Sequence, residues 1–130
     1  MIVADASSVL EVLRHTHDGE AIEATLFGIG QSLHAPHLID VEVVQVIRRF
    51  VASGDIKEDR ARAMIEDLAG IGIRRYPHDV LLPRVWELRG NLSAYDAVYV
   101  ALAEMLDAPL LTRDRRLADA AARYAHIQLI

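Results

Sequence analysis

The chain has 130 residues, a length typical of one domain that can bury its own core. Hydrophobic residues make up 52% of it, and the net charge of −5 argues against a general nucleic-acid-coating protein, which is usually basic. The absence of cysteine excludes disulfides and thiolate metal sites. There is no signal-peptide pattern and no apolar run of the roughly 20 residues that span a membrane. We therefore expect a single cytoplasmic domain over residues 1–130, without membrane association.

Short apolar runs alternate with amphipathic stretches along the chain. In chain order we expect a strand in the apolar run at 1–6, which ends at Asp5, then helices at about 8–15 and 18–27, a strand at 33–36, and helices at 38–52 and 58–69. A strand at 71–77, helices at 80–89 and 94–106, a strand at 110–112, a helix at 115–123 and a strand at 126–130 should follow. Ser8 and Glu11 have the spacing of a capping box, which predicts that the first helix starts at Ser8. Pro83 is tolerable only in the first turn of its helix.

This alternation predicts an α/β fold. Strands that alternate with helices usually form a parallel sheet with helices on both faces. We therefore expect a three-layer sandwich, in which a mostly parallel sheet of about five strands is flanked by helices.

Four acids flanked mainly by apolar residues lie where predicted elements begin or end: Asp5, Glu42, Asp96 and Asp114. Asp5 and Asp114 follow predicted strands, so both should lie at the carboxyl edge of the sheet, where ligands bind near a topological switch point. Four converging carboxylates repel one another unless a cation compensates. Hard divalent ions such as Mg²⁺ take oxygen ligands and support attack of water on phosphodiesters. We predict that these acids hold such an ion for phosphoryl transfer.

All four assignments have simpler competitors. Asp5 could simply cap or end a strand, and Asp114 could simply pair with Arg113 or Arg115. Ser93 and Asp96 fit a capping box at the start of their helix, where an acid also suits the helix dipole. Asp40 competes with Glu42, because residues two apart on a helix point to nearly opposite sides. Asp40 suits the dipole near the helix start, so we assign Glu42 to the site.

The basic and histidine motifs carry less information. Arginines beside Asp114, including Arg113 and Arg115, are candidates to hold substrate phosphate or a partner's carboxylates, whereas the other arginine clusters are expected to be solvated. His15 and His17 diverge on a helix, which makes a zinc site unpromising. The glycine pattern at 28–30 is an incomplete dinucleotide fingerprint that follows a helix rather than a strand, which disfavours a Rossmann enzyme.

Four segments resemble PIN-domain ribonucleases, and specifically the VapC-type toxins of bacterial toxin–antitoxin modules. They are VADASSVL, APHLIDVEVVQVIRR, LSAYDAVYVALAE and LLTRDRRLA, which contain the four acids in order and cover nearly the whole chain. The resemblance implies a Mg²⁺- or Mn²⁺-dependent endonuclease that cuts single-stranded RNA, often tRNA or rRNA. It also implies a small antitoxin that blocks the site, and a homodimer.

The resemblance extends to residues around the acids. Ser7 matches a position that helps order the catalytic water, and Thr112 lies close to the fourth acid, where we assign it to substrate binding. Asp119 matches an additional acid of some relatives only poorly.

Three other functions stay open on the residues alone: another metal-dependent phosphohydrolase, a housekeeping RNA-processing nuclease, and a catalytically silent module that binds an antitoxin. The high apolar content suggests a docking surface for an antitoxin or a second subunit on residues 38–50 and 65–68.

Overall fold

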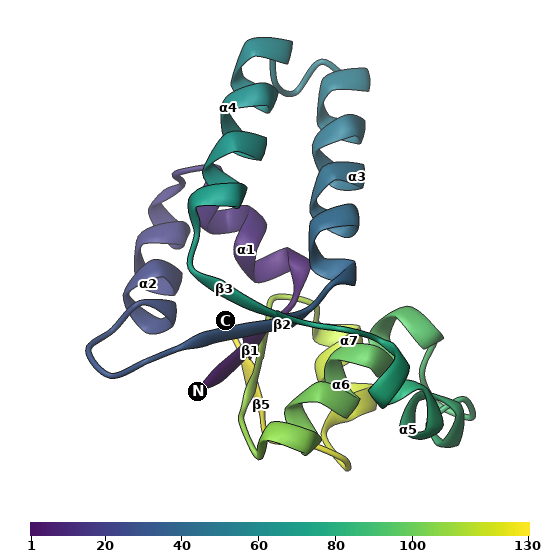
Figure 1. Ribbon diagram of the computed structural model, residues 1–130. Helices are drawn as coiled ribbons and strands as arrows, with labels where there is room; N and C mark the ends of the chain where they lie inside the picture. Colours follow the sequence, from purple (N-terminus) through teal and green to yellow (C-terminus); the bar gives the residue numbers. More distant parts are fainter.

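The computed structural model describes all 130 residues, which form five strands, seven α-helices and one 3₁₀ turn (Figure 1). The elements are β1 (Ile2–Ala4), α1 (Ala6–Leu13), α2 (His17–Leu26), β2 (Leu33–Pro36), α3 (Leu38–Ala52), α4 (Glu58–Gly70), β3 (Ile73–Tyr76), η1 (Asp79–Leu81), α5 (Leu82–Glu87), α6 (Ala94–Leu106), β4 (Leu110–Thr112), α7 (Arg115–Ala121) and β5 (Ile127–Leu129).

The sheet has the strand order β3-β2-β1-β4-β5, and every neighbouring pair is parallel. Helices α1 to α4 lie on one side of it and α5 to α7 on the other, with α3 and α4 standing up as a helical pair (Figure 1). The predicted three-layer α/β fold is thus confirmed. None of the helices combines the length and apolarity that a membrane span requires.

The chain winds outward from β1 through β2 to β3 and then returns to place β4 on the free side of β1. The direction of winding therefore reverses between β1 and β4. In open parallel sheets this reversal opens the carboxyl edge to ligands. The loops after β1 and β4, which contain Asp5 and Asp114, both begin at this edge.

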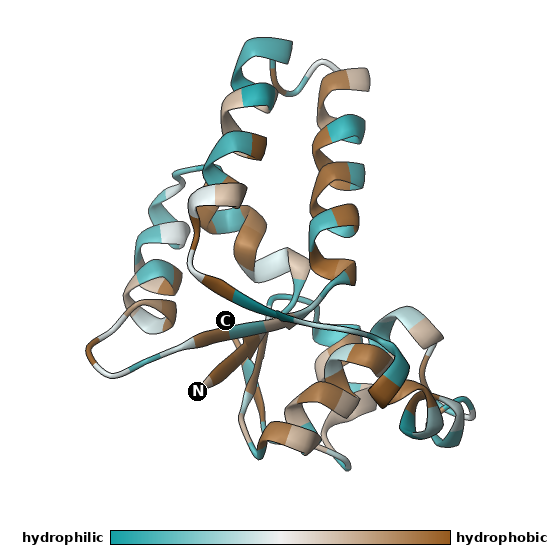
Figure 2. Cartoon of the chain, in the orientation of Figure 1, coloured by the Kyte–Doolittle hydropathy of each residue, from teal (hydrophilic) through white to brown (hydrophobic).

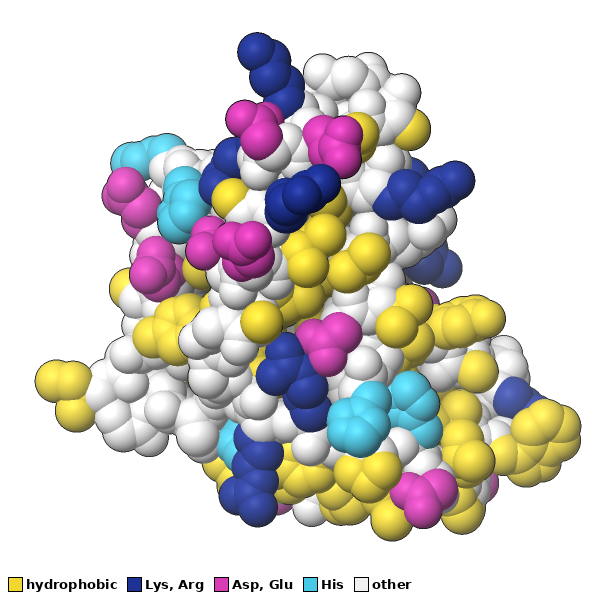
Figure 3. Space-filling model, turned by 45° about the horizontal axis from the view of Figure 1, so that its top comes forward, with side chains coloured by type: hydrophobic (Ala, Val, Ile, Leu, Met, Phe, Trp, Pro, Cys, Tyr) yellow, Lys and Arg dark blue, Asp and Glu magenta, His cyan; other side chains and the backbone are white.

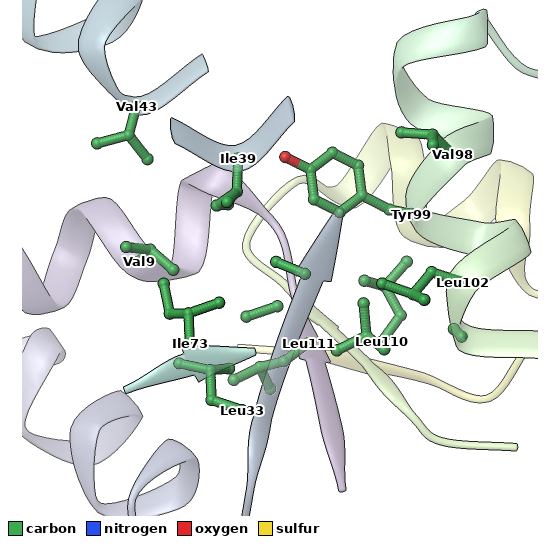
Figure 4. Packing of buried hydrophobic residues seen from close by; sticks show 14 of the residues in the cluster. Val9, Leu33, Ile39, Val43, Ile73, Val98, Tyr99, Leu102, Leu110 and Leu111 are labelled. Atoms are coloured by element: carbon green, nitrogen blue, oxygen red, sulfur yellow. The ribbon is translucent and has the colours of Figure 1, made fainter. Parts of the chain in front are cut away.

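Apolar strands and helix faces meet in one core of 34 buried residues. Figure 2 colours β1 as apolar and β3, at the edge of the sheet, mostly as hydrophilic, and it shows apolar stripes along helices such as α3. All residues of β1 and β4 are buried, as expected for strands covered on both faces. In Figure 4, Tyr99 and Leu102 of α6 pack near Leu110, while the Tyr99 hydroxyl points away from the sheet toward α3.

Several predicted bounds differ from the structure: the strands predicted at 1–6, 71–77 and 126–130 are shorter, and α7 ends at Ala121. Two further differences have identifiable causes. Helix α1 begins at Ala6, because Asp5 rather than Ser8 caps it. The predicted helix at 80–89 is a 3₁₀ turn followed by the short α5, with Pro83 in the first turn of α5, where its missing N–H leaves no intrahelical hydrogen bond broken.

Candidate metal-dependent active site

Asp5 is the most enclosed of the four acids, at 6% exposed. Its Oδ1 accepts hydrogen bonds from the Ser7 hydroxyl at 2.6 Å and from the backbone N–H of Ser8 at 3.1 Å. Its Oδ2 accepts one from the Thr112 hydroxyl. Burial raises the pKa of Asp5, and these donors partly offset the rise. The carboxylate is therefore fixed in orientation, and its negative charge is only partly compensated.

Ser7 and Thr112 tie the ends of β1 and β4 together. While donating to Asp5, each also accepts a backbone N–H from the loop after β4: Arg113 N–H to Ser7 at 2.9 Å, and Asp114 N–H to Thr112 at 3.0 Å. Thr112 is fully buried. The prediction that Thr112 binds substrate does not fit this burial, and we assign it instead to positioning Asp5.

Glu42 projects from α3 toward α6, where the Tyr99 hydroxyl donates to its Oε1 at 2.5 Å. Burial raises the pKa of Glu42, the bond from Tyr99 lowers it, and the charges of Asp96 and Asp5 raise it. Burial and the neighbouring Glu42 raise the pKa of Tyr99, so its hydroxyl stays protonated and remains a donor. Glu42 therefore faces the other acids.

Asp40, the competitor of Glu42, has a different partner. Both of its carboxylate oxygens accept from Arg75 on β3, at 2.7 and 2.8 Å. This bidentate ion pair satisfies Asp40 at the sheet edge. The placement separates the two acids in the way that their spacing on a helix predicts.

Asp96 combines the two roles that competed for it. Its backbone N–H donates to the Ser93 hydroxyl at 3.1 Å, which caps α6. Its carboxylate lies near Arg116, with Oδ2 and Nη2 3.6 Å apart. Burial raises the pKa of Asp96, Arg116 lowers it and Asp114 raises it. The cap uses the backbone of Asp96 and leaves the carboxylate for the site.

Asp114 is the N-cap of α7, and its Oδ1 accepts from the Leu117 N–H at 3.1 Å. Its Oδ2 lies 3.9 Å from Arg116 Nη2. Asp114 therefore resembles Asp5: one oxygen serves a helix start and the other points elsewhere. We call Asp5, Glu42, Asp96 and Asp114 the acidic site.

The two arginines predicted to bind substrate lie outside this site. The Arg113 side chain pairs with Glu11 at 3.5 Å and Asp18 at 3.4 Å, toward α1 and α2, which does not fit a phosphate ligand beside the acids. Arg115 is exposed and makes no ion pair or side-chain hydrogen bond. Asp119 is exposed on α7, also without such contacts.

Sequence reasoning missed three residues whose side chains contact the acids: Ser8, Tyr99 and Arg116. The Ser8 hydroxyl donates to Asp5 Oδ1 at 3.3 Å. Tyr99 lies three residues after Asp96, a spacing that places both on one helix face and is a usable signal. In the sequence, Arg116 stands out only as part of an arginine cluster. Its position two residues after Asp114 does not reveal that it also reaches Asp96.

The chemistry of the acidic site suits a hard divalent cation. Its ligand atoms are all carboxylate oxygens, which Mg²⁺ and Mn²⁺ prefer. Three of the acids have raised pKa values, mainly through burial, so their ionised forms lack compensating charge. No three acidic or histidine side chains are gathered in ion-binding geometry in this structure, so ion binding would require side-chain rearrangement.

The doubly wound sheet and the carboxylates around its switch point define a class: α/β domains with an acidic, metal-suited site at the carboxyl edge of the sheet. Comparison with known proteins gives the family. The PIN domain family matches residues 2–123, and the chain belongs to this family.

Its relatives are VapC ribonucleases, which confirms the resemblance predicted from the sequence. Ribonuclease VapC1 of Mycobacterium tuberculosis is 42% identical over 129 residues, covering 98% of this chain and 96% of the relative. Ribonuclease VapC12 of the same organism is 36% identical over 130 residues, covering 100% and 99%.

Solved structures share the fold at lower sequence identity. VapBC2 from Rickettsia felis, bound to a promoter DNA fragment, matches with a TM-score of 0.72 and 12% identity, over 99% of this chain and 98% of the other. Mycobacterium tuberculosis VapC20, described as a sarcin–ricin-loop-cleaving toxin, matches with a TM-score of 0.70 and 13% identity, over 92% and 95%.

Proposed function

We propose that this protein is a Mg²⁺-dependent endoribonuclease that acts as the toxin of a toxin–antitoxin pair, with Mn²⁺ able to replace Mg²⁺. The observation that carries the proposal is the placement of Asp5 and Asp114 at the β1–β4 switch point, electrostatically linked to Glu42 and Asp96. The VapC ribonucleases at 36–42% identity over nearly the whole chain support the same activity.

In this proposal the four acids hold the cation. A divalent ion supplies positive charge that makes water a nucleophile at neutral pH and stabilises the attacked phosphodiester. Ser7 and Thr112 fix the orientation of Asp5, and Tyr99 fixes that of Glu42. The first turn of α6 holds the backbone of Asp96, and the start of α7 holds that of Asp114. The chain therefore contributes oriented carboxylates whose repulsion favours ion binding.

The proposed substrate is single-stranded RNA, for example in tRNA or rRNA. We infer that phosphate contacts come from Arg116 rather than from Arg113, because acids already engage Arg113. Arg115 is exposed and has no side-chain contact that supports the substrate role predicted for it, so we assign the phosphate contact to Arg116 alone.

The proposed protein partners are a small antitoxin and a second copy of the chain. The VapBC2 structure, which has the same fold, supports an antitoxin. Large apolar side chains of η1, α5 and the start of α6 are exposed, and Figure 3 shows hydrophobic surface gathered on one side of the molecule: Val80, Leu82, Trp86 and Tyr95. Leu68 is buried, so the predicted docking surface at 65–68 is smaller than expected. We place the docking surface around α5 and the start of α6.

The direct test of the enzyme is cleavage of total cellular RNA by the purified chain, with Mg²⁺, with Mn²⁺ and with a chelator. We expect discrete fragments only with metal, and their loss in Asp96→Asn. Asp119→Asn is the matched control, because Asp119 is exposed and has no contact in the site. Equal cleavage by the two variants, or cleavage that persists with the chelator, contradicts the proposal.

Expression in bacteria separates the toxin from its alternatives. Wild-type protein should arrest growth, and Asp96→Asn should not. Co-expression of a small antitoxin that binds the chain should restore growth. A housekeeping nuclease would cleave RNA without this relief, and a silent binding module would not cleave RNA at all.

A further inference from the structure

Arg116 is the only basic side chain that reaches the acidic site. Its Nη2 lies 3.6 Å from Asp96 Oδ2 and 3.9 Å from Asp114 Oδ2, and no other arginine, lysine or histidine side-chain nitrogen lies within 4.0 Å of a carboxylate oxygen of the four acids. Asp96 lies in the first turn of α6 and Asp114 is the N-cap of α7, so one guanidinium spans two elements of the site.

The neighbouring arginines set this contact apart from a general basic surface. Arg113 precedes Asp114 but is engaged by Glu11 and Asp18. Arg115 follows Asp114 and contacts no acid. Arg116 alone is directed at the acids, although its side chain is 81% exposed and has room to adopt other rotamers.

We propose, on the basis of the proposed function, that the Arg116 guanidinium alternates between two partners: the site carboxylates and an RNA phosphate. Without a divalent ion it bridges Asp96 and Asp114. When an ion takes those carboxylates, Arg116 is displaced and its guanidinium binds a phosphate of the RNA beside the cleaved bond.

Charge balance supports the first state. Asp96 and Asp114 repel each other, and Arg116 is the cation that offsets this repulsion at Asp96. A divalent ion bound to the same carboxylate oxygens would bring like charge next to the guanidinium. The ion and Arg116 therefore compete, and ion binding must include the cost of breaking two ion pairs.

Geometry and chemistry support the second state. Arg116 lies in the first turn of α7 and reaches two of the carboxylates that would hold the ion. An RNA phosphate attracted to that ion would therefore lie close to its guanidinium. Guanidinium groups match phosphate oxygens with two parallel hydrogen bonds. The displaced side chain is exposed, so it can turn from the carboxylates to substrate without disturbing the core.

The test compares Arg116→Gln with Arg115→Gln, because both remove one positive charge from adjacent exposed positions. The first readout is the affinity for Mn²⁺, measured by calorimetry without RNA. Since an exposed ion pair shifts an equilibrium only modestly, we expect Arg116→Gln to bind Mn²⁺ about two- to fivefold more tightly than wild type, with little change in Arg115→Gln.

The second readout is binding of a single-stranded RNA in the presence of Ca²⁺, which occupies oxygen sites with slower or no turnover. We expect Arg116→Gln to bind this RNA more weakly than wild type and than Arg115→Gln, with a shallower dependence on salt. Tighter ion binding together with weaker RNA binding is the signature of a side chain that changes partner.

Two outcomes overturn the inference. Equal effects of the two substitutions on the affinity for Mn²⁺ would show that only the net charge matters. Weaker Mn²⁺ binding by Arg116→Gln than by wild type would show that Arg116 favours ion binding. The proposed function is tested separately by wild type, which must bind Mn²⁺ whatever the role of Arg116.

Discussion

Tyr99→Phe is the substitution that most directly tests how the acidic site works. Tyr99 is 2% exposed and packs in the core, and phenylalanine keeps that packing. The substitution removes only the hydroxyl that donates to Glu42 Oε1 at 2.5 Å. We expect slower RNA cleavage by a protein that is otherwise folded.

The magnitude follows from the one hydrogen bond that is lost. A hydrogen bond to a charged group contributes about 1.5–3 kcal/mol, and because Glu42 is only partly buried, water replaces some of it. We expect the free energy of unfolding to fall by about 1 kcal/mol at neutral pH. The pKa of Glu42 is already raised, mainly by burial, and the lost donor raises it further.

The sign of the pH dependence can be worked out from this change in pKa. A proton on Glu42 competes with the metal ion, so the active form declines as pH falls through the pKa of Glu42. In Tyr99→Phe the active fraction begins to decline at a higher pH. At pH values below the pKa of Glu42, a tenfold gain in the proton affinity of Glu42 lowers the apparent affinity for the ion about tenfold. At high pH Glu42 is ionised in both proteins, so the two rates should approach each other.

The assay is the initial rate of cleavage of a short fluorescent RNA from about pH 5 to about pH 9 at limiting Mg²⁺. The control is Tyr95→Phe on the same helix, because Tyr95 is 65% exposed and its hydroxyl makes no hydrogen bond. A Tyr99→Phe rate that is reduced by the same factor at every pH would contradict this prediction, because it would indicate a general structural defect.

Three further substitutions test the surroundings of the site. Thr112→Val removes a buried donor to Asp5, so it should lower the free energy of unfolding by about 1–3 kcal/mol and weaken Mn²⁺ binding. Urea unfolding and calorimetry measure the two effects. Thr112→Ser keeps the donor and should restore both the stability and the Mn²⁺ affinity. Asp40→Asn breaks the ion pair with Arg75, so it should cost at most about 1 kcal/mol in thermal unfolding and leave RNA cleavage intact; lost cleavage would place Asp40 in the site. Burial lowers the pKa of His34 from its ordinary 6.5, so the unfolded chain takes up the proton first and stability falls below about pH 6.5. His34→Gln should flatten the pH dependence of urea unfolding between about pH 7 and about pH 5, and an unchanged slope would contradict the buried neutral histidine.

Elements with strong periodic patterns and clear stops could be read from the sequence. The bounds of β2, α3, α6 and β4 are those predicted, because proline, glycine or a serine cap marks their ends. The start of α1 was missed because Ser8 and Asp5 are both good caps, and the choice between them depends on where β1 ends. Local signals cannot decide that, since β1 ends where its pairing with β4 ends.

The positions of the four acids could be predicted, but their partners could not. The bond from Tyr99 to Glu42 spans 57 residues and that from Thr112 to Asp5 spans 107. Such contacts depend on how helices dock on the sheet. Arg113 illustrates the same limit: its place beside Asp114 suggested a phosphate ligand, whereas the docking of α1 and α2 supplies it with two acids.

The position of each acid on its element decides which group stabilises its negative charge. Asp5 and Asp114 are N-caps, and Asp96 lies in the first turn of α6, so three of the acids are next to the positive end of a helix dipole. That field offsets part of their repulsion before any cation binds. Glu42 is the fifth residue of α3 and lies beyond this field, which acts mainly within the first turn.

The hydroxyl of Tyr99 then has a specific reason to be there. It gives Glu42 a fixed donor in place of the helix start that the other three acids have. A helix start cannot be removed by one side-chain substitution, whereas a phenol can. Among the four acids, Glu42 should therefore be the one whose charge depends most on a side chain of another helix, the Tyr99 hydroxyl of α6. Tyr99→Phe should accordingly weaken ion binding more than Ser93→Ala, which removes the cap of α6.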